Sequence, residues 1–256
     1  MSPLNKPSTR NSDLLWGITR KITPLCLLLP LLGTGLSYIA YANDVAQSNL
    51  PWWIGTIVTV LCVSLPFAIS SRYRRSNLLK AYGLIVMVGL AATYFFFGVF
   101  GYFFYFGFAP MPSLVRLAGL GGGVALSVYW AGISVRAVRH TLSAGNFVKN
   151  SFSETESNFV YKLQASMARF EKLHKERSPF PRVIYWLVMG VSPLALILNR
   201  VLSPAFGGNG VLFIIAVFAM PMSLWIIGLL VRLYLLMVEL PNTLERQSGK
   251  SVMAVE

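Results

Sequence analysis

The side chains of this chain best suited to chemistry are two histidines, two cysteines and nine acidic residues. His140 and His174 are candidates for proton transfer, because imidazole titrates near neutral pH. Each stands alone among basic residues, where a histidine is more often solvated than catalytic. Both lie outside the apolar runs, which argues against a haem held between membrane helices. Cys26 and Cys62 lie inside such runs and behave there as small hydrophobic residues.

The acidic residues do not form a group that would hold a catalytic metal ion, which needs clustered carboxylates. Glu154 and Glu156 are the closest pair. The segment 153–156, Ser-Glu-Thr-Glu, has the pattern of a helix capping box, which explains this pair without a metal. The segment 249–251, Gly-Lys-Ser, resembles the end of a phosphate-binding loop but follows an apolar run instead of a strand. We therefore expect no catalytic residue, no metal and no cofactor.

The elements that would position any site are membrane helices. The 256 residues are 55% hydrophobic and only 12% charged, with a mean hydropathy of +0.61. A helix needs about 20 apolar residues to cross the hydrocarbon core of a bilayer. Six runs meet this requirement: 22–41, 51–70, 81–108, 114–135, 183–202 and 211–238. The sequence therefore predicts an all-α integral membrane protein with a bundle of six transmembrane helices.

The distribution of Lys and Arg predicts the orientation of this bundle. Twenty of the 22 basic residues fall on the side that holds the N-terminal segment, 71–80, 136–182 and the C-terminal segment. Only Arg116 and Arg200 fall on the other side. Basic residues accumulate in cytoplasmic loops, so we expect both termini in the cytoplasm of a bacterial cell with an inner membrane. The same rule accounts for the net charge of +13, so we expect no nucleic-acid partner.

The first 42 residues also have the pattern of a secretory signal, with a basic lead, an apolar centre and small residues near a cleavage position. The apolar run of 20 residues is longer than the usual core of such a signal, so we expect it to stay uncleaved as the first helix. The chain then divides into a cytoplasmic N-terminal tail at 1–21, helices one to four at 22–135, a basic segment at 136–182, helices five and six at 183–238, and a cytoplasmic tail at 239–256.

The basic segment 136–182 predicts an amphipathic helix over 154–177, between the fourth and fifth membrane helices. Phe159, Leu163, Met167 and Phe170 recur at helical spacing and form one apolar stripe. The leading interpretation is that the stripe packs under the bundle. The alternatives are a helix in the headgroup layer of the membrane and a docking surface for a protein partner. The candidate residues for lipid or partner contact are Lys162, Arg169, Lys172, Lys175 and Arg177.

Within the membrane, small and kinking residues are the features that stand out. Gly119 and Gly123 form a pair that lets helices approach closely, and we expect packing within the chain, with a homo-oligomer as the alternative. The second half of the third run, 94–108, is dense in Phe and Tyr, which readily fill the space beside such glycines. Pro193 and Pro221 lie mid-run in the fifth and sixth helices, where proline kinks a helix and provides a hinge.

The six runs contain almost no ionisable residues, and those few lie at the ends, which argues against a proton-coupled transporter. We expect a non-enzymatic inner-membrane subunit of a multi-protein envelope assembly, such as secretion, conjugation or export machinery. Its partners would be membrane lipids and other proteins, reached through the basic segment. Two alternatives stay open. One is the permease subunit of an ATP-driven transporter, and the other is an immunity protein against a pore-forming toxin.

Overall fold

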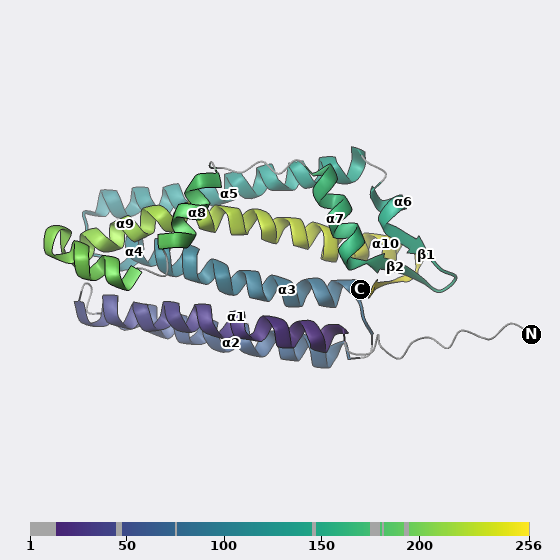
Figure 1. The fold of residues 1–256 in the computed structure, drawn as a ribbon, viewed down its shortest axis with the longest axis horizontal. Helices are drawn as coiled ribbons and strands as arrows, with labels where there is room; N and C mark the ends of the chain where they lie inside the picture. Colours follow the sequence, from purple (N-terminus) through teal and green to yellow (C-terminus); the bar gives the residue numbers. More distant parts are fainter. Residues whose placement is uncertain are drawn as a thin grey trace, which may run out of the picture.

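The computed structural model is mostly helical, with one small sheet (Figure 1). It describes residues 14–44, 48–74, 76–144, 147–174, 180, 182–191 and 195–255. The chain is predicted above to be all-α, and the sheet corrects that prediction. The helical runs keep their expected order along the chain.

Long helices make up the body of the molecule. Several of them change pitch along their length into a π-helical segment, labelled η. In chain order they are α1 (Leu14–Ser37) with η2 (Tyr38–Asp44), α2 (Leu50–Arg72), α3 (Leu79–Tyr94) with η3 (Phe95–Phe103) and α4 (Phe104–Phe108), α5 (Ser113–Ala144), α8 (Arg182–Val191), and α9 (Ala195–Tyr234) with η5 (Leu235–Glu239) and α10 (Leu240–Ser248).

Within the described residues, five helices are long and apolar enough to cross a membrane. They are Leu14–Ala42, Leu50–Arg72, Leu79–Phe108, Ser113–Ser143 and Gly207–Ser248. Apolar helices of this length are those of an integral membrane protein. At 1.5 Å per residue, the three longest measure about 45 Å or more, which exceeds the roughly 30 Å hydrocarbon core. Their ends must therefore project from it.

The predicted fifth run, 183–202, falls on α8 and the start of α9, and residues 192–194 between them lie outside the described residues. Helix α8 has ten residues and is about 15 Å long, too short to cross a bilayer alone. Helix α9 follows, and Gly207 interrupts it with a left-handed φ of 67°. Its side chain is only a hydrogen atom, which is why it adopts this conformation at little cost. The sixth transmembrane helix stays a prediction.

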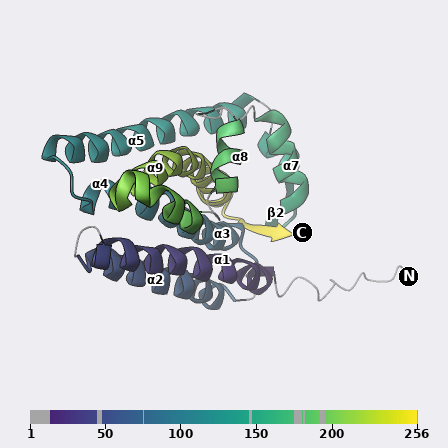
Figure 2. The same cartoon turned by 60° about the vertical axis from the view of Figure 1, so that its left-hand side comes forward.

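The helices lie side by side in layers (Figures 1 and 2). Helices α1 and α2 form a hairpin that packs on α3, and α9 packs on the other side of α3. Helix α5 is the outermost and contacts α9. The start of α1, strand β3 and the rest of the sheet lie at one end of the bundle, whereas Asn209 donates a hydrogen bond to the carbonyl of Pro110 at the other end (3.2 Å).

Close contact between α5 and the aromatic part of the preceding helix depends on glycine. A Cβ atom added at Gly119 would lie 2.0 Å from a ring carbon of Phe106, and one at Gly123 would lie 2.4 Å from a ring carbon of Tyr102. The hydroxyl of Tyr102 also donates a hydrogen bond to the carbonyl of Gly119 (2.9 Å). Rings of 94–108 thus fill the space above these two glycines. Gly121 and Gly122 face open space.

Alanine at Gly119 or Gly123 is expected to destabilise the protein by about 1–3 kcal/mol, because the added methyl group forces these rings to move. Alanine at Gly121 or Gly122 is the matched control, with the same change on the same helix and nothing to displace. We expect these controls to leave stability unchanged or slightly raised. Thermal unfolding in detergent measures the difference. Equal losses at all four positions would show that the ring contacts do not hold α5 in place.

Candidate functional site

The polar end of the bundle carries a folded unit, which we call the cap and define as residues 147–174 and 240–255. It contains α6 (Phe147–Ser151), β1 (Phe152–Glu154), β2 (Asn158–Lys162), α7 (Leu163–Leu173), α10 and β3 (Ser251–Val255). The segment between the fourth and fifth runs and the end of the chain meet there (Figure 1). Most of the tail expected at 239–256 is thus part of this unit, as α10 and β3.

Strand β3 joins the two segments that make up the cap. Strands β1 and β2 form an antiparallel hairpin in which Phe152 pairs with Tyr161. Strand β3 runs parallel to β2, with Asn158 opposite Ser251. On its other side β3 contacts the turn before α3, where the amide of Ala254 donates to the carbonyl of Asn77 (2.8 Å). Three segments far apart in the sequence thus share backbone hydrogen bonds.

The prediction of a helix from residue 154 is wrong for its first part. The residues of the supposed capping box form β1 and the turn of the hairpin, where the amide of Thr155 donates to the carbonyl of Asn158 (2.9 Å). Residues 158–162, Asn-Phe-Val-Tyr-Lys, are rich in aromatic and β-branched types that suit a strand. Helix α7 starts only at Leu163, and residues 175–177 of the predicted helix lie outside the described residues.

The cap has a hydrophobic core that continues into the bundle. Phe147, Tyr161, Phe170 and Val252 are almost completely buried. The rings of Phe147 and Phe170 pack edge to face at 5.6 Å. All four belong to one cluster with residues from the ends of α3, α5 and η5: Leu79, Val138, Leu236 and Met237. The apolar side of α7 therefore packs under the bundle, and the same burial raises the pKa of the Tyr161 hydroxyl.

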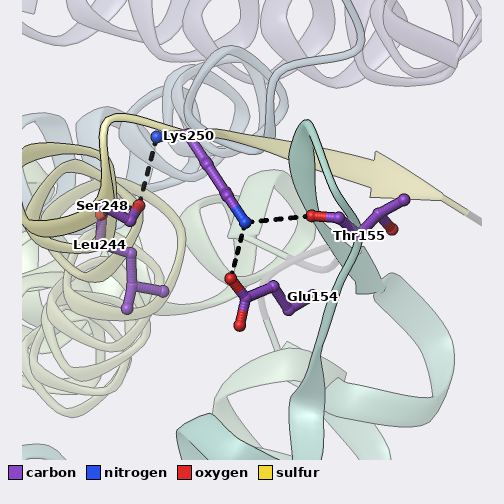
Figure 3. A network of polar contacts seen from close by, with 5 residues as sticks. All are labelled: Glu154, Thr155, Leu244, Ser248 and Lys250. Carbon is purple, nitrogen blue, oxygen red and sulfur yellow. Dashed lines mark hydrogen bonds and ion pairs between the residues drawn. The ribbon is translucent and has the colours of Figure 1, made fainter.

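Ion pairs connect the cap to itself and to the helix ends. The ammonium group of Lys250 lies 2.7 Å from the carboxylate of Glu154 and donates to the carbonyl of Thr155 (Figure 3). Lys80 pairs with Glu245 at 2.8 Å, and this pair joins α3 to α10. A third pair, Arg139 with Glu239 at 3.1 Å, joins α5 to η5. Each is partly exposed, so each contributes at most about 1 kcal/mol.

The predicted contact residues lie on the outer surface of the cap as far as the structure describes them. Lys162 ends β2, and Arg169 and Lys172 lie on α7; all three are exposed. The Arg169 guanidinium donates to the carbonyl of Asn150, which ties α7 to α6. Lys175 and Arg177 lie outside the described residues. The exposed side of α7 therefore carries Arg169 and Lys172 together with Glu171, whereas Leu163, Ser166 and Phe170 on its other side are buried.

The structure describes only one of the two predicted hinge residues. Pro193 lies outside the described residues. Pro221 is buried within α9, and the non-helical backbone of this helix is at Gly207 instead. Among the described residues, no group of three or more His, Cys, Asp or Glu side chains could hold a metal ion.

Comparison with protein-family models, curated proteins and solved structures finds no match for this chain. Its own geometry is thus the basis for any functional argument.

Sequence reasoning missed the residues that assemble the cap, chiefly Lys250, Glu154, Glu245 and strand β3. The ion pair of Lys250 and Glu154 joins residues 96 positions apart, for which no local pattern exists. One available signal was the short run 251–255, Ser-Val-Met-Ala-Val, in which two β-branched valines suit a strand. In the structure Val252 and Ala254 are buried, at the period of two that a strand imposes.

Val252→Asp is expected to unfold the cap and to weaken the packing of the helix ends that share its core. The substitution places an unpaired charge at a fully buried position, which costs about 3 kcal/mol or more. Hydrogen exchange measures the result: the amides of 158–162 should lose their protection.

The matched control for this variant is Gln247→Asp, the same change of charge at an exposed position five residues earlier. It should keep the protection. If Val252→Asp keeps it as well, β3 does not hold the cap together.

Proposed function

We propose that this chain is a non-enzymatic subunit of a multi-protein envelope assembly in a bacterial inner membrane, and that partners bind to its cap. The observation that carries the proposal is the folded cap itself. Two separate polar segments meet in one sheet and one core, in place of the loop and tail that would only connect or end membrane helices. A rigid surface of this kind suits specific contact, because little conformational entropy is lost when it binds.

The charges of the cap support the same proposal. Of the four acidic residues of the cap that the structure describes, Glu154 and Glu245 pair with basic residues of the chain itself, and Glu156 and Glu171 are exposed. Other basic side chains remain exposed, among them Lys149, Lys162 and Lys172. The outward charge of the cap is therefore mainly positive. Surfaces of one sign attract a partner of opposite sign and align it during the encounter, so an acidic surface on a partner protein fits the cap best.

The proposed topology has six transmembrane helices with both termini and the cap in the cytoplasm. Besides the distribution of basic residues, the arrangement of the loops supports it. Lys80, Lys172 and Lys250 all belong to the capped end, whereas Pro110 and Asn209 meet at the opposite end. Between the cap and Asn209 the chain passes through α8 and the first part of α9. These two pieces together would supply the fifth crossing.

Reversal of two cap charges should release partners. The variant Lys162→Glu with Lys172→Glu is expected to reduce co-purification of partner proteins in gentle detergent by about tenfold or more, because like charges then face each other at the contact. Quantitative mass spectrometry of the tagged protein, purified from its native membrane, measures this change.

The control variant is Arg72→Glu with Arg74→Glu, which makes the same change of charge at exposed positions at the end of α2. It should keep the partners. Equal loss in both variants would indicate general attraction to anionic lipid, and a native protein that purifies alone would contradict the assembly proposal.

A further inference from the structure

A small cavity lies where the bundle meets the cap, between α5 and α9. Its volume is about 30 Å³, and six of the residues that line it carry the argument: Trp130, Ser134, His174, Trp225, Gly228 and Arg232. One water-sized group needs roughly 10–15 Å³ by this measure, so the cavity holds about two such groups. It therefore has room for part of a small polar group and not for a whole metabolite.

The lining is organised along the two helices. Trp130 and Ser134 are four residues apart on α5, and Trp225, Gly228 and Arg232 are spaced by three and four on α9, so each set lies on one helix face. Helix α5 and the part of α9 after Gly207 both run toward the cap. The indole rings therefore lie on the apolar side of the cavity, whereas Arg232 and His174 lie on the side of the cap. Tryptophan and arginine in this order are typical of the boundary between hydrocarbon and headgroups.

Three residues of this lining, Trp130, Ser134 and Arg232, carry groups that can donate hydrogen bonds. The Trp130 indole N–H donates only, and Arg232 and Ser134 supply a cation and a hydroxyl. No carboxylate is among the lining residues that the structure describes. The indole nitrogen of Trp130 is buried and has no hydrogen-bond partner among the described residues. A buried donor without a partner costs about 1–3 kcal/mol, which an acceptor in the cavity would offset.

Gly228 keeps this donor accessible. A Cβ atom added there would lie 3.2 Å from the Trp130 nitrogen and 3.5 Å from the Ser134 hydroxyl oxygen. Any side chain at position 228 would therefore occupy the space in front of both groups. The glycine leaves this space to another atom.

His174 is held over the cavity by contacts from the cap and from α5. Its ring stacks on Phe170 with 4.9 Å between centroids, and its Nδ1 lies 3.0 Å from the Thr141 hydroxyl. That hydroxyl already donates its single hydrogen to the carbonyl of Ala137 (2.9 Å), so the Nδ1–H of His174 must be the donor to Thr141. The cap thus supplies one wall of the cavity.

We propose that this cavity takes up one or two oxygen atoms of the phosphate group of an anionic phospholipid, whose remaining atoms lie outside it. A phosphate diester offers only hydrogen-bond acceptors, which matches the donors of the lining. The planar guanidinium group of arginine can donate two parallel hydrogen bonds to phosphate oxygens. Basic pockets between transmembrane helices are known to take lipid headgroups. The lipid is the favoured source because the helix that carries Trp130 also exposes large apolar side chains next to it in the sequence, with Val128 and Tyr129 each 67% exposed. A soluble phosphate ester would present the same chemistry.

Native mass spectrometry of the full chain in detergent tests this proposal. The probes are phosphatidylglycerol, a diacylglycerol with the same acyl chains but no phosphate, and soluble glycerol phosphate. Phosphatidylglycerol is expected to stay bound and the other two to dissociate. Arg232→Gln should weaken its binding about tenfold or more, and Trp130→Phe about threefold to tenfold, because each removes a donor and little volume.

Gly228→Ala closes the cavity without removing any polar group, so it gives a second and independent variant. Gly132→Ala is its control, since Gly132 on α5 has open space beside it. Loss of phosphatidylglycerol in Trp130→Phe and Gly228→Ala, with binding kept in Gly132→Ala, supports the site even if Arg232→Gln fails to fold. Equal binding in all variants, or equal binding of diacylglycerol, overturns the proposal. Glycerol phosphate binding as tightly as the lipid overturns the assignment of the source.

Discussion

Helices that are longer than the membrane is thick impose the main constraint on this structure. The span that contains α3 and the one that contains α9, η5 and α10 both exceed the roughly 30 Å hydrocarbon core. Their apolar side chains continue past it, and water would hydrate them there. The cap covers these ends: Leu79 and Leu236 are fully buried in the same cluster as Phe170 and Val252. Cap and bundle therefore stabilise each other.

This shared core also explains why strand β3 is important for the stability of the cap. Strand β3 buries Val252 and Ala254 between the hairpin and the helix ends, and its backbone bonds to both β2 and Asn77. The ion pair of Lys250 with Glu154 lies at the edge of this core, partly in solvent. Burial of apolar side chains is thus the larger contribution, and the ion pairs mainly fix the alignment of the segments.

The sequence predicted what depends on local pattern. Apolar runs predicted the membrane class, and the five long helices follow these runs. The glycines and the aromatic residues nearby indicated close packing, and the structure has Phe106 against Gly119.

Contacts between residues far apart in the sequence could not be predicted from local patterns. The segment 153–156 fits both a capping box and a hairpin, and the pairing of β1 with β2, which in turn pairs with β3, decides between them. Phe159 and Leu163 fit one helical stripe, yet they reach the same core from a strand and a helix. The cavity of Trp130 and Arg232 likewise joins two helices that the sequence places about 100 residues apart.

The arrangement links three surfaces that are all at one end of the bundle. The basic outer face of the cap is available to a partner, its inner face shares the core of the helices, and His174 adjoins the proposed lipid cavity. A partner that shifts the cap would act on the core and the cavity together. The account requires that this whole end lies on the cytoplasmic side of the membrane, opposite the end where Pro110 and Asn209 meet.

Labelling with a membrane-impermeant thiol reagent tests that requirement most directly. The natural cysteines, Cys26 and Cys62, are buried, so the labelling of an added cysteine can be measured without a contribution from them. Lys172→Cys lies on the exposed face of the cap, and Ser113→Cys is exposed at the start of α5. In intact cells with a permeable outer membrane, the account predicts labelling of the Ser113→Cys variant alone, with Lys172→Cys labelled only after the inner membrane is opened. The reverse pattern, or labelling of both in intact cells, would contradict it.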